Sequence, residues 1–263
     1  SSGDASRPSL RLPASIARSG PDSISPMTTA QHAGSLAGRR GLTLGDYLIP
    51  SSLATRAPAW ARDVALIAGG VILLILGARI AFELPAVSLG RFYVPDNPYV
   101  PVTLQTFGVL FTSAALGARR GLSATAIYLL IGAVGLPVFA SGRSGSETFF
   151  ALEQGRLVLG ATGGYLVGFL LASGIVGALA QRGWDRRLGG SLGAMLIGTV
   201  LIYAVGLVWL ALALDVGVSD VLPFGLYPFV PGDILKLLLA AGALPLGWRL
   251  AGRQASGGSS STS

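Results

Sequence analysis

Residues 228–248 read PFVPGDILKLLLAAGALPLGW, and this stretch decides the class of protein. It is about as long as the ~20 apolar residues that a helix needs to cross the hydrocarbon core of a bilayer. Its only charged residues are Asp233 and Lys236, three positions apart. We therefore interpret the stretch as a membrane span that carries two charges.

Five further apolar runs precede this one, so the sequence predicts an all-α integral membrane protein with six transmembrane helices. Of the 263 residues, 51% are hydrophobic and only 12% are charged, against about 25% charged residues in a soluble domain. Glycine accounts for 38 residues, which suits helices that approach closely in lipid. The runs cover approximately residues 64–82, 100–118, 122–140, 157–180, 192–214 and 231–250.

The six runs lie between two stretches of different composition. Residues 1–60 are rich in Ser, Arg, Gly and Ala and have no apolar period, so we expect a disordered cytoplasmic leader there. Residues 61–252 form the predicted membrane domain. Residues 253–263 have the composition of a flexible tail.

The arginines predict the orientation of the spans. The net charge of +7 does not indicate nucleic-acid binding, because the arginines form short clusters between apolar runs. Clusters lie before the first run, between the second and third, between the fourth and fifth, and after the sixth. The positive-inside rule then predicts a multi-pass protein of the cell membrane with both termini in the cytoplasm.

The charged pair in the last run is the first candidate site. Lys236 is the only lysine of the chain, and Asp233 lies on the same helix face. An ionisable residue within a span is costly unless it is paired or hydrated, so it is a functional candidate by default. Two interpretations stay open: a site near the outer mouth for a ligand with an anionic and an amide-like group, or a structural ion pair.

Polar and small residues at the start of two other runs are further candidates. Thr103 and Gln105 open the second run, where they either line a cavity or bond the backbone. Gly163 and Gly164 open the fourth run and permit the close approach of a helix or a ligand.

Small residues also mark the first run. Ala65 and Gly69 are four residues apart, a spacing that favours close helix packing, either within the fold or against a separate membrane subunit. Cysteine is absent, and the single histidine, His32, lies in the leader. We therefore predict no metal site, no cofactor and no catalytic residue.

Four segments in order resemble the BioY family: PVTLQTFGVLF (101–111), YLLIGAVGLPVFASG (128–142), GATGGYLVGF (160–169) and PFVPGDILK (228–236). BioY proteins are the biotin-specific substrate-capture (S) components of energy-coupling-factor (ECF) vitamin transporters. The resemblance covers about residues 64–250 and implies a six-helix S-component fold. It also implies three partner chains: a transmembrane coupling subunit and two cytoplasmic ATPases. This chain has no Walker A motif, so ATP hydrolysis must occur elsewhere.

The resemblance also implies site residues. In the family, the Asp and Lys of the last-helix motif contact biotin, and they correspond here to Asp233 and Lys236. A polar or basic residue after the GLPVFA motif is also implicated, for which Ser141 and Arg143 are the candidates. The loop over 141–159 is longer than is usual in the family, so Arg156 is an alternative to Arg143.

The chemistry of biotin fits these residue types. Its apolar bicycle needs aromatic or aliphatic walls, its ureido group an acceptor, and its carboxylate a cation. Phe139 and Tyr165 offer walls, Asp233 offers an acceptor, and Lys236 or Arg143 offers the cation.

Biotin capture is the leading hypothesis, and three others remain. The same fold could bind another small vitamin. An integral membrane enzyme acting on a lipid or isoprenoid is disfavoured, because such enzymes usually cluster Asp, Glu or His beside their spans, and only Asp233 is so placed here. A structural subunit without a ligand would gain little from two charges in a span.

Overall fold

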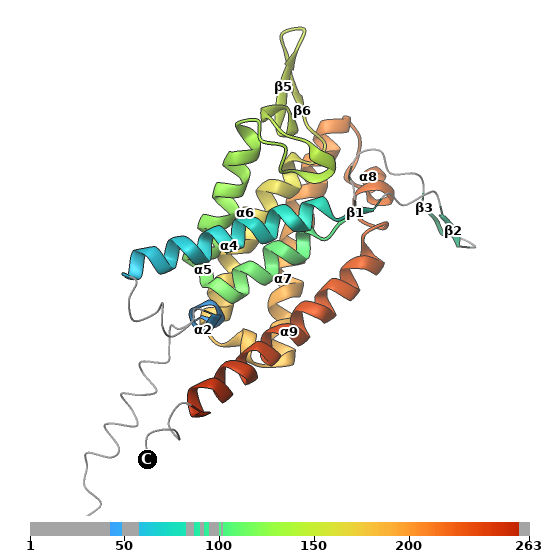
Figure 1. Ribbon diagram of the computed structural model, residues 1–263. Helices are drawn as coiled ribbons and strands as arrows, with labels where there is room; N and C mark the ends of the chain where they lie inside the picture. Colours follow the sequence, from blue (N-terminus) through green and yellow to red (C-terminus); the bar gives the residue numbers. More distant parts are fainter. Residues whose placement is uncertain are drawn as a thin grey trace, which may run out of the picture. The chain divides into compact units, whose positions relative to one another are not determined.

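The computed structural model describes residues 43–48, 58–82, 87–89, 92–94, 100 and 102–257. The chain divides into two units, residues 1–39 and 40–263, and all described residues belong to the second. The described part is mostly helical (Figure 1). Its α-helices are α2 (Leu44–Leu48), α4 (Ala59–Arg79), α5 (Gln105–Ala133), α6 (Gly163–Gln181), α7 (Leu188–Leu214), α8 (Val218–Gly225) and α9 (Val230–Gly257).

Short strands and 3₁₀ turns connect the helices, so the described fold is not purely helical as the sequence predicted. Three two-stranded antiparallel sheets are present among the described residues, pairing β1 with β4, β2 with β3 and β5 with β6. The strands are β1 (Ala81–Phe82), β2 (Val87–Leu89), β3 (Phe92–Val94), β4 (Val102–Thr103), β5 (Phe150–Glu153) and β6 (Arg156–Leu159). The 3₁₀ turns are η1 (Ala140–Gly142), η2 (Ser146–Thr148) and η3 (Trp184–Arg186).

Four of the described helices are long and apolar enough to cross a membrane. They are α4, α6, α7 and the Val230–Ala251 part of α9, and they match the first, fourth, fifth and sixth predicted runs. The fourth run is shorter as a helix than predicted, because residues 157–159 belong to strand β6 and α6 begins only at Gly163. The four helices expose many large apolar side chains, as a lipid environment requires.

Helix α5 covers most of the second and third predicted runs (100–118 and 122–140) and reverses direction between them. Gly117 has φ 80° and ψ 173°, a conformation that residues with a side chain rarely adopt. Beyond it the chain returns along itself: a Cβ on Gly121 would lie 2.7 Å from Ser113 Cα. Further along, the Gln105 side chain donates to Tyr128 Oη at 2.8 Å. The two halves of α5 are therefore antiparallel and packed together.

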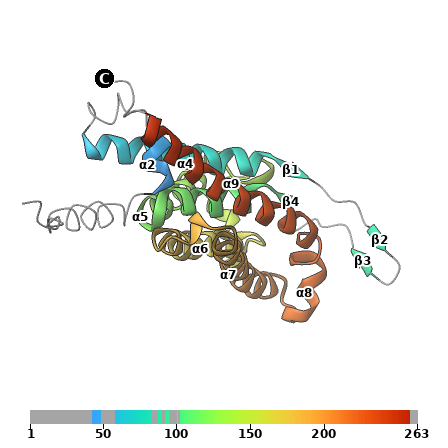
Figure 2. The same ribbon diagram turned by 90° about the horizontal axis from the view of Figure 1, so that it is seen from below.

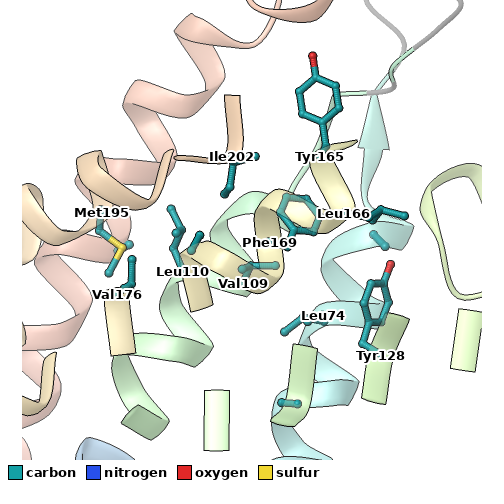
Figure 3. Close-up of a cluster of buried hydrophobic side chains, with 14 of the residues drawn as sticks. Leu74, Val109, Leu110, Tyr128, Tyr165, Leu166, Phe169, Val176, Met195 and Ile202 are labelled. Atoms are coloured by element: carbon teal, nitrogen blue, oxygen red, sulfur yellow. The ribbon is translucent and has the colours of Figure 1, made fainter. Parts of the chain in front are cut away.

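The core is built around α6, which packs against α5 and α7, while α4 covers the other side of α5 (Figure 2). Small residues allow this close packing. A Cβ on Gly168 of α6 would lie 2.9 Å from Ile202 Cα of α7, so a larger residue there would force the helices apart. Figure 3 shows the buried side chains at the centre of the bundle, among them Leu74, Val109, Leu110, Tyr128, Phe169, Val176, Met195 and Ile202.

The bundle has two distinct ends. At the cavity end, α4 finishes, α5, α6 and α9 begin, and the β5–β6 hairpin projects (Figure 1). At the opposite end, here called the α2 end, lie the Gly117 reversal, η3 and the last turns of α9. The short helix α2 packs there against α5 and α9.

Described helices lie beyond residues 61–252, the predicted bounds of the membrane domain, at both ends. Helix α2 and the start of α4 at Ala59 fall within the stretch expected to be a disordered leader. The remaining leader residues, 1–42 and 49–57, lie outside the described residues. Helix α9 continues to Gly257, past the predicted start of the tail at residue 253. Tail residues 258–263 also lie outside the described part.

Candidate binding site

A cavity opens at the cavity end of the bundle, between the first turns of α5 and α6, the middle of α7 and the residue before α9. The empty space between its lining atoms, together with the open solvent at the mouth, is about 620 Å³. Side chains from segments far apart in sequence line it: Val100, Thr103, Gln105, Thr106, Phe139, Ala140, Arg143, Thr162, Tyr165, Leu166, Phe169, Ile202, Tyr203 and Phe229.

Aromatic rings form much of the cavity wall. Phe139, Tyr165 and Phe229 are each less than 10% exposed. Phe139 meets Tyr128 edge-on at 5.5 Å between ring centroids. Gly132 makes this position possible, because a Cβ there would lie 2.1 Å from Phe139 Cζ. Phe139 and Tyr165, which the sequence analysis offered as walls of a ligand site, both line this cavity.

The polar wall comes from the residues that lead into α5. Gln105 is the first residue of that helix and is 3% exposed. Its side-chain nitrogen donates to Tyr128 Oη at 2.8 Å, and Tyr128 donates to the Val138 carbonyl at 3.1 Å. Thr103 lies in β4, and its hydroxyl accepts the backbone N–H of Gln105 at 3.2 Å. Both predicted residues line the cavity, and both are also bonded within the protein.

The loop after the GLPVFA motif contributes Arg143 at the cavity rim. Hydrogen bonds from Phe139 N to the Arg143 carbonyl (3.1 Å) and from Gly145 N to the Gly132 carbonyl (2.7 Å) hold this loop. Arg143 is exposed and also borders a polar space that opens under the β5–β6 hairpin. Ser141 is exposed, has φ 56° and does not line the cavity. Arg156 lies in β6 and does not line it either.

Asp233 and Lys236 lie in a separate cleft next to the cavity, with Thr106 bordering both spaces. Lys236 Nζ is 2.9 Å from Asp233 Oδ1, and the two side chains are 11% and 7% exposed. The other carboxylate oxygen, Oδ2, accepts the hydroxyl of Tyr203, which lines the cavity. The pair is therefore linked to the cavity through a phenol.

Gly163 and Gly164 serve close packing between helices, one of the two uses the sequence allowed. A Cβ on Gly164 would lie 2.1 Å from Trp209 Cβ of α7, and one on Gly163 would lie 2.9 Å from Trp209 Cζ2. Trp209 in turn donates to the Gly160 carbonyl at 2.8 Å. Neither glycine lines the cavity.

Sequence reasoning missed Tyr203 and Phe229 as cavity residues. Tyr203 is the only tyrosine in the fifth apolar run, and a phenol within a span was a usable signal. Phe229 lies inside the PFVPGD motif, four residues before Asp233. Nothing in a single sequence indicates that Tyr203 meets both Tyr165, 38 positions away, and Phe229, since only tertiary packing brings these rings together.

Comparison with known protein families gives a clear assignment. The sequence profile described as the BioY family matches residues 50–253. The chain belongs to the BioY family. The resemblance of the four motifs is thus confirmed, and the family groups this member with transporter subunits rather than enzymes.

Relatives of this BioY family member come from bacteria and archaea. The Biotin transporter BioY of Rhizobium etli is 35% identical over 188 residues, which cover 68% of this chain and 89% of the relative. The Probable biotin transporter BioY of Pyrococcus horikoshii is 36% identical over 192 residues, covering 73% of this chain and 98% of the relative.

A solved structure has the same fold as this family member. It is the crystal structure of the S-component for biotin from an ECF-type ABC transporter, with a TM-score of 0.56 and 22% identity. The match covers 75% of this chain and 93% of that one. The mostly helical fold of this chain is therefore similar to that of an ECF S-component.

Proposed function

We propose that this chain captures biotin in the cavity and delivers it to the cytoplasm as the S component of an ECF transporter. The observation that carries the proposal is a cavity with aromatic walls beside a buried Asp233–Lys236 pair, in a chain whose relatives are named biotin transporters. A cavity of mostly apolar lining with a few placed polar groups suits a small amphiphilic ligand.

In this proposal each part of biotin has a partner in or beside the cavity. Phe139 and Tyr165 cover the apolar bicycle, and Thr103 and Gln105 supply polar contacts at its edge. Arg143 or Lys236 attracts the carboxylate. Asp233 and Lys236 reach the ligand past Thr106, which borders both the cavity and the cleft.

The predicted Ser141, Gly163 and Gly164 have supporting places in the proposed site. Ser141 belongs to the loop that carries Arg143, so it contributes through the shape of that loop. The two glycines bring α6 close to α7 and so set the position of Tyr165.

We further propose six spans, with the two antiparallel halves of α5 as the second and third. Support comes from the Gly117 reversal and from the packing of Gly121 against Ser113. Six spans put both termini on one side, and that is the α2 end. Arginines gather at that end, which favours a cytoplasmic α2 end and a cavity that opens to the outside of the cell membrane. They are Arg62, Arg119, Arg120, Arg182, Arg186, Arg187 and Arg249.

Energised transport needs ATP hydrolysis, and this chain has no Walker A motif. We therefore propose that it works with a transmembrane coupling subunit and two cytoplasmic ATPases. The candidate contact surface is the outward face of α4. Ala65 and Gly69 are exposed there, and a Cβ on Gly69 would meet no described atom within 4 Å. A small-residue patch facing away from its own bundle favours the close approach of another membrane helix.

Radiolabelled biotin binding to the detergent-purified full chain tests the proposal. We expect saturable binding that unlabelled biotin displaces and that thiamine and riboflavin do not. The Gly69→Leu variant is a matched control, because Gly69 is exposed and does not line the cavity. This variant should bind biotin normally but lose co-purification with the coupling subunit and energised uptake. Displacement by thiamine or riboflavin instead would assign the site to another vitamin, and absence of saturable biotin binding would refute the proposal.

A further inference from the structure

We infer that the Tyr203 hydroxyl accepts a hydrogen bond from a ligand N–H group in the cavity, and that Asp233 and Lys236 hold it in that role. The inference rests on the proposed biotin site, whose ligand carries two ureido N–H groups. It assigns Tyr203 as a ligand-contacting residue, and it gives the charged pair a positioning role in addition to its proposed contacts with the ligand.

The direction of the Tyr203–Asp233 hydrogen bond carries the first step. A carboxylate paired with an ammonium has only acceptor oxygens, so in this contact the phenol must be the donor. A phenol has one hydrogen, and here that hydrogen is used. The remaining lone pairs of the Tyr203 oxygen can therefore only accept a hydrogen bond. Because Tyr203 lines the cavity, a ligand there can satisfy this oxygen only with a hydrogen-bond donor.

The charged neighbours strengthen this acceptor. Donation to a carboxylate increases electron density on the phenol oxygen, and hydrogen bonds that involve charged groups are stronger than neutral ones. Lys236 Nζ, at 2.9 Å from Asp233 Oδ1, compensates the carboxylate without reaching the cavity lining. The pair can thus act on the ligand through Tyr203 as well as by direct contact past Thr106.

The ring of Tyr203 is held in place from two sides. It meets Tyr165 edge-on at 6.2 Å and Phe229 at 6.3 Å between ring centroids. Tyr165 is itself fixed by donation to the Gly225 carbonyl at 2.8 Å. Gly206, one turn along α7, leaves room for Tyr165, since a Cβ there would lie 2.5 Å from Tyr165 Cδ1. The acceptor is therefore preorganised rather than recruited by the ligand.

A fixed acceptor also selects the ligand. A cyclic urea presents N–H donors to the Tyr203 oxygen. A ligand that presents only acceptors would leave this oxygen without a hydrogen bond, or would place a second electron-rich atom against it. Sites that hydrogen-bond a ligand N–H reject analogues that lack it, because their own polar group then stays unsatisfied.

The test is a binding cycle with wild type and Tyr203→Phe, each measured with biotin and with a biotin analogue methylated on both ureido nitrogens. We expect Tyr203→Phe to weaken biotin about tenfold and to leave the weaker affinity for the methylated analogue unchanged. The steric cost of the methyl groups is common to both proteins and cancels in the cycle. Tyr227→Phe is the matched control: it removes a phenol hydroxyl from an exposed ring outside the cavity lining and should change neither affinity.

A second variant guards against a folding defect in Tyr203→Phe. Replacement of Tyr203 by 3,5-difluorotyrosine keeps the ring and hydroxyl but makes the oxygen a weaker acceptor, so biotin should bind several-fold more weakly and the analogue equally well. Equal losses for both ligands in either variant would overturn the inference while leaving the proposed function intact. Failure of the wild-type chain to bind biotin would overturn both.

Discussion

Two groups of charged residues lie at opposite ends of the bundle and differ in what they connect. At the cavity end, Asp233 and Lys236 belong to one helix, and their side chains are 7% and 11% exposed. At the α2 end, Arg120 joins Asp46 of α2 at 2.7 Å and Asp63 of α4 at 2.6 Å. There the side chains are 23% exposed for Arg120, 23% for Asp46 and 48% for Asp63.

The comparison separates a structural role from a ligand-directed one. The Arg120 group ties three segments together near water, where desolvation is modest and the ion pairs hold the α2 end in place. The Asp233–Lys236 pair joins no two segments by itself and bears nearly full desolvation, which an ion pair alone seldom offsets. The desolvation cost of this pair has a function if the pair acts on a ligand. The phenol of Tyr203, which donates to Asp233 and lines the cavity, supports that role.

The largest expected effect is on biotin affinity after changes at the cavity end. Lys236→Met and Asp233→Asn should each weaken biotin about ten- to a hundredfold, because hydrogen bonds to charged groups contribute roughly 1.5–3 kcal/mol. The double variant should bind no better than the weaker single variant. Equilibrium binding of radiolabelled biotin to purified variants measures this, with size-exclusion chromatography as the control for folding.

A purely structural pair gives a different pattern in the same experiment. The single variants would then express poorly, and the double variant would recover both expression and affinity, because no uncompensated charge remains. Recovery of wild-type affinity in the double variant would therefore end the ligand-directed interpretation of this pair.

The second-largest expected effect follows from a substitution at the α2 end, which should change the stability of the protein and not its affinity for biotin. Arg120→Met removes both ion pairs and leaves Asp46 and Asp63 without their shared cation, so we expect a loss of about 1–2 kcal/mol in the free energy of unfolding. Thermal unfolding in detergent should show a lower midpoint, while the folded variant keeps its biotin affinity. Arg119→Met is the control, because this exposed neighbour makes neither ion pair.

Arg120→Met can also contradict the comparison. A loss of biotin affinity in the folded variant, at unchanged stability, would mean that the α2 end acts on the ligand site. The distinction between the two ends would then be lost.

The two ends also differ in how far the sequence predicts them. Hydropathy located the four described helices that are apolar enough to cross a membrane, and the cost of charge within lipid singled out Asp233 and Lys236. Both arguments depend on composition along one helix. Local reasoning also selected Thr103 and Gln105, and the fit to biotin selected Phe139; the structure brings all three to one cavity.

What the sequence could not predict depends on contacts between distant segments. Arg120 and Asp46 are 74 positions apart, and no local pattern relates them. The role of Tyr203 is hidden for the same reason, since its partner Asp233 is 30 positions away. The β5–β6 hairpin was missed because residues 157–159 are apolar and extend the following helical run without a visible break.

The smallest expected effect is a pH dependence at Asp185, a buried carboxylate of the α2 end outside the spans. Asp185 is 2% exposed, and its Oδ2 accepts the indole N–H of Trp248. Its Oδ1 has no hydrogen-bond partner among the described residues. Burial raises the pKa of Asp185 above its usual value of 3.8, although the Trp248 hydrogen bond and nearby Arg186 oppose this.

The raised pKa fixes the sign of the effect. Between the unfolded-state pKa and the raised folded-state pKa, the folded protein binds more protons than the unfolded one, so stability falls as pH rises through that window. Asp185→Asn keeps an acceptor oxygen for Trp248 and removes the charge. At neutral pH the variant should therefore be more stable than wild type by about 1 kcal/mol, and this advantage should shrink as pH is lowered.

Thermal unfolding of both proteins in detergent, between about pH 4 and pH 8, measures the difference. Asp215→Asn controls for the loss of one negative charge, because that residue is exposed at the end of α7. A variant that is less stable than wild type by the same amount at every pH would mean that the charge of Asp185 is well compensated. The α2 end would then contain a buried carboxylate whose charge is as well compensated as that of Asp233. The difference between the two ends would then depend on the Arg120 group alone.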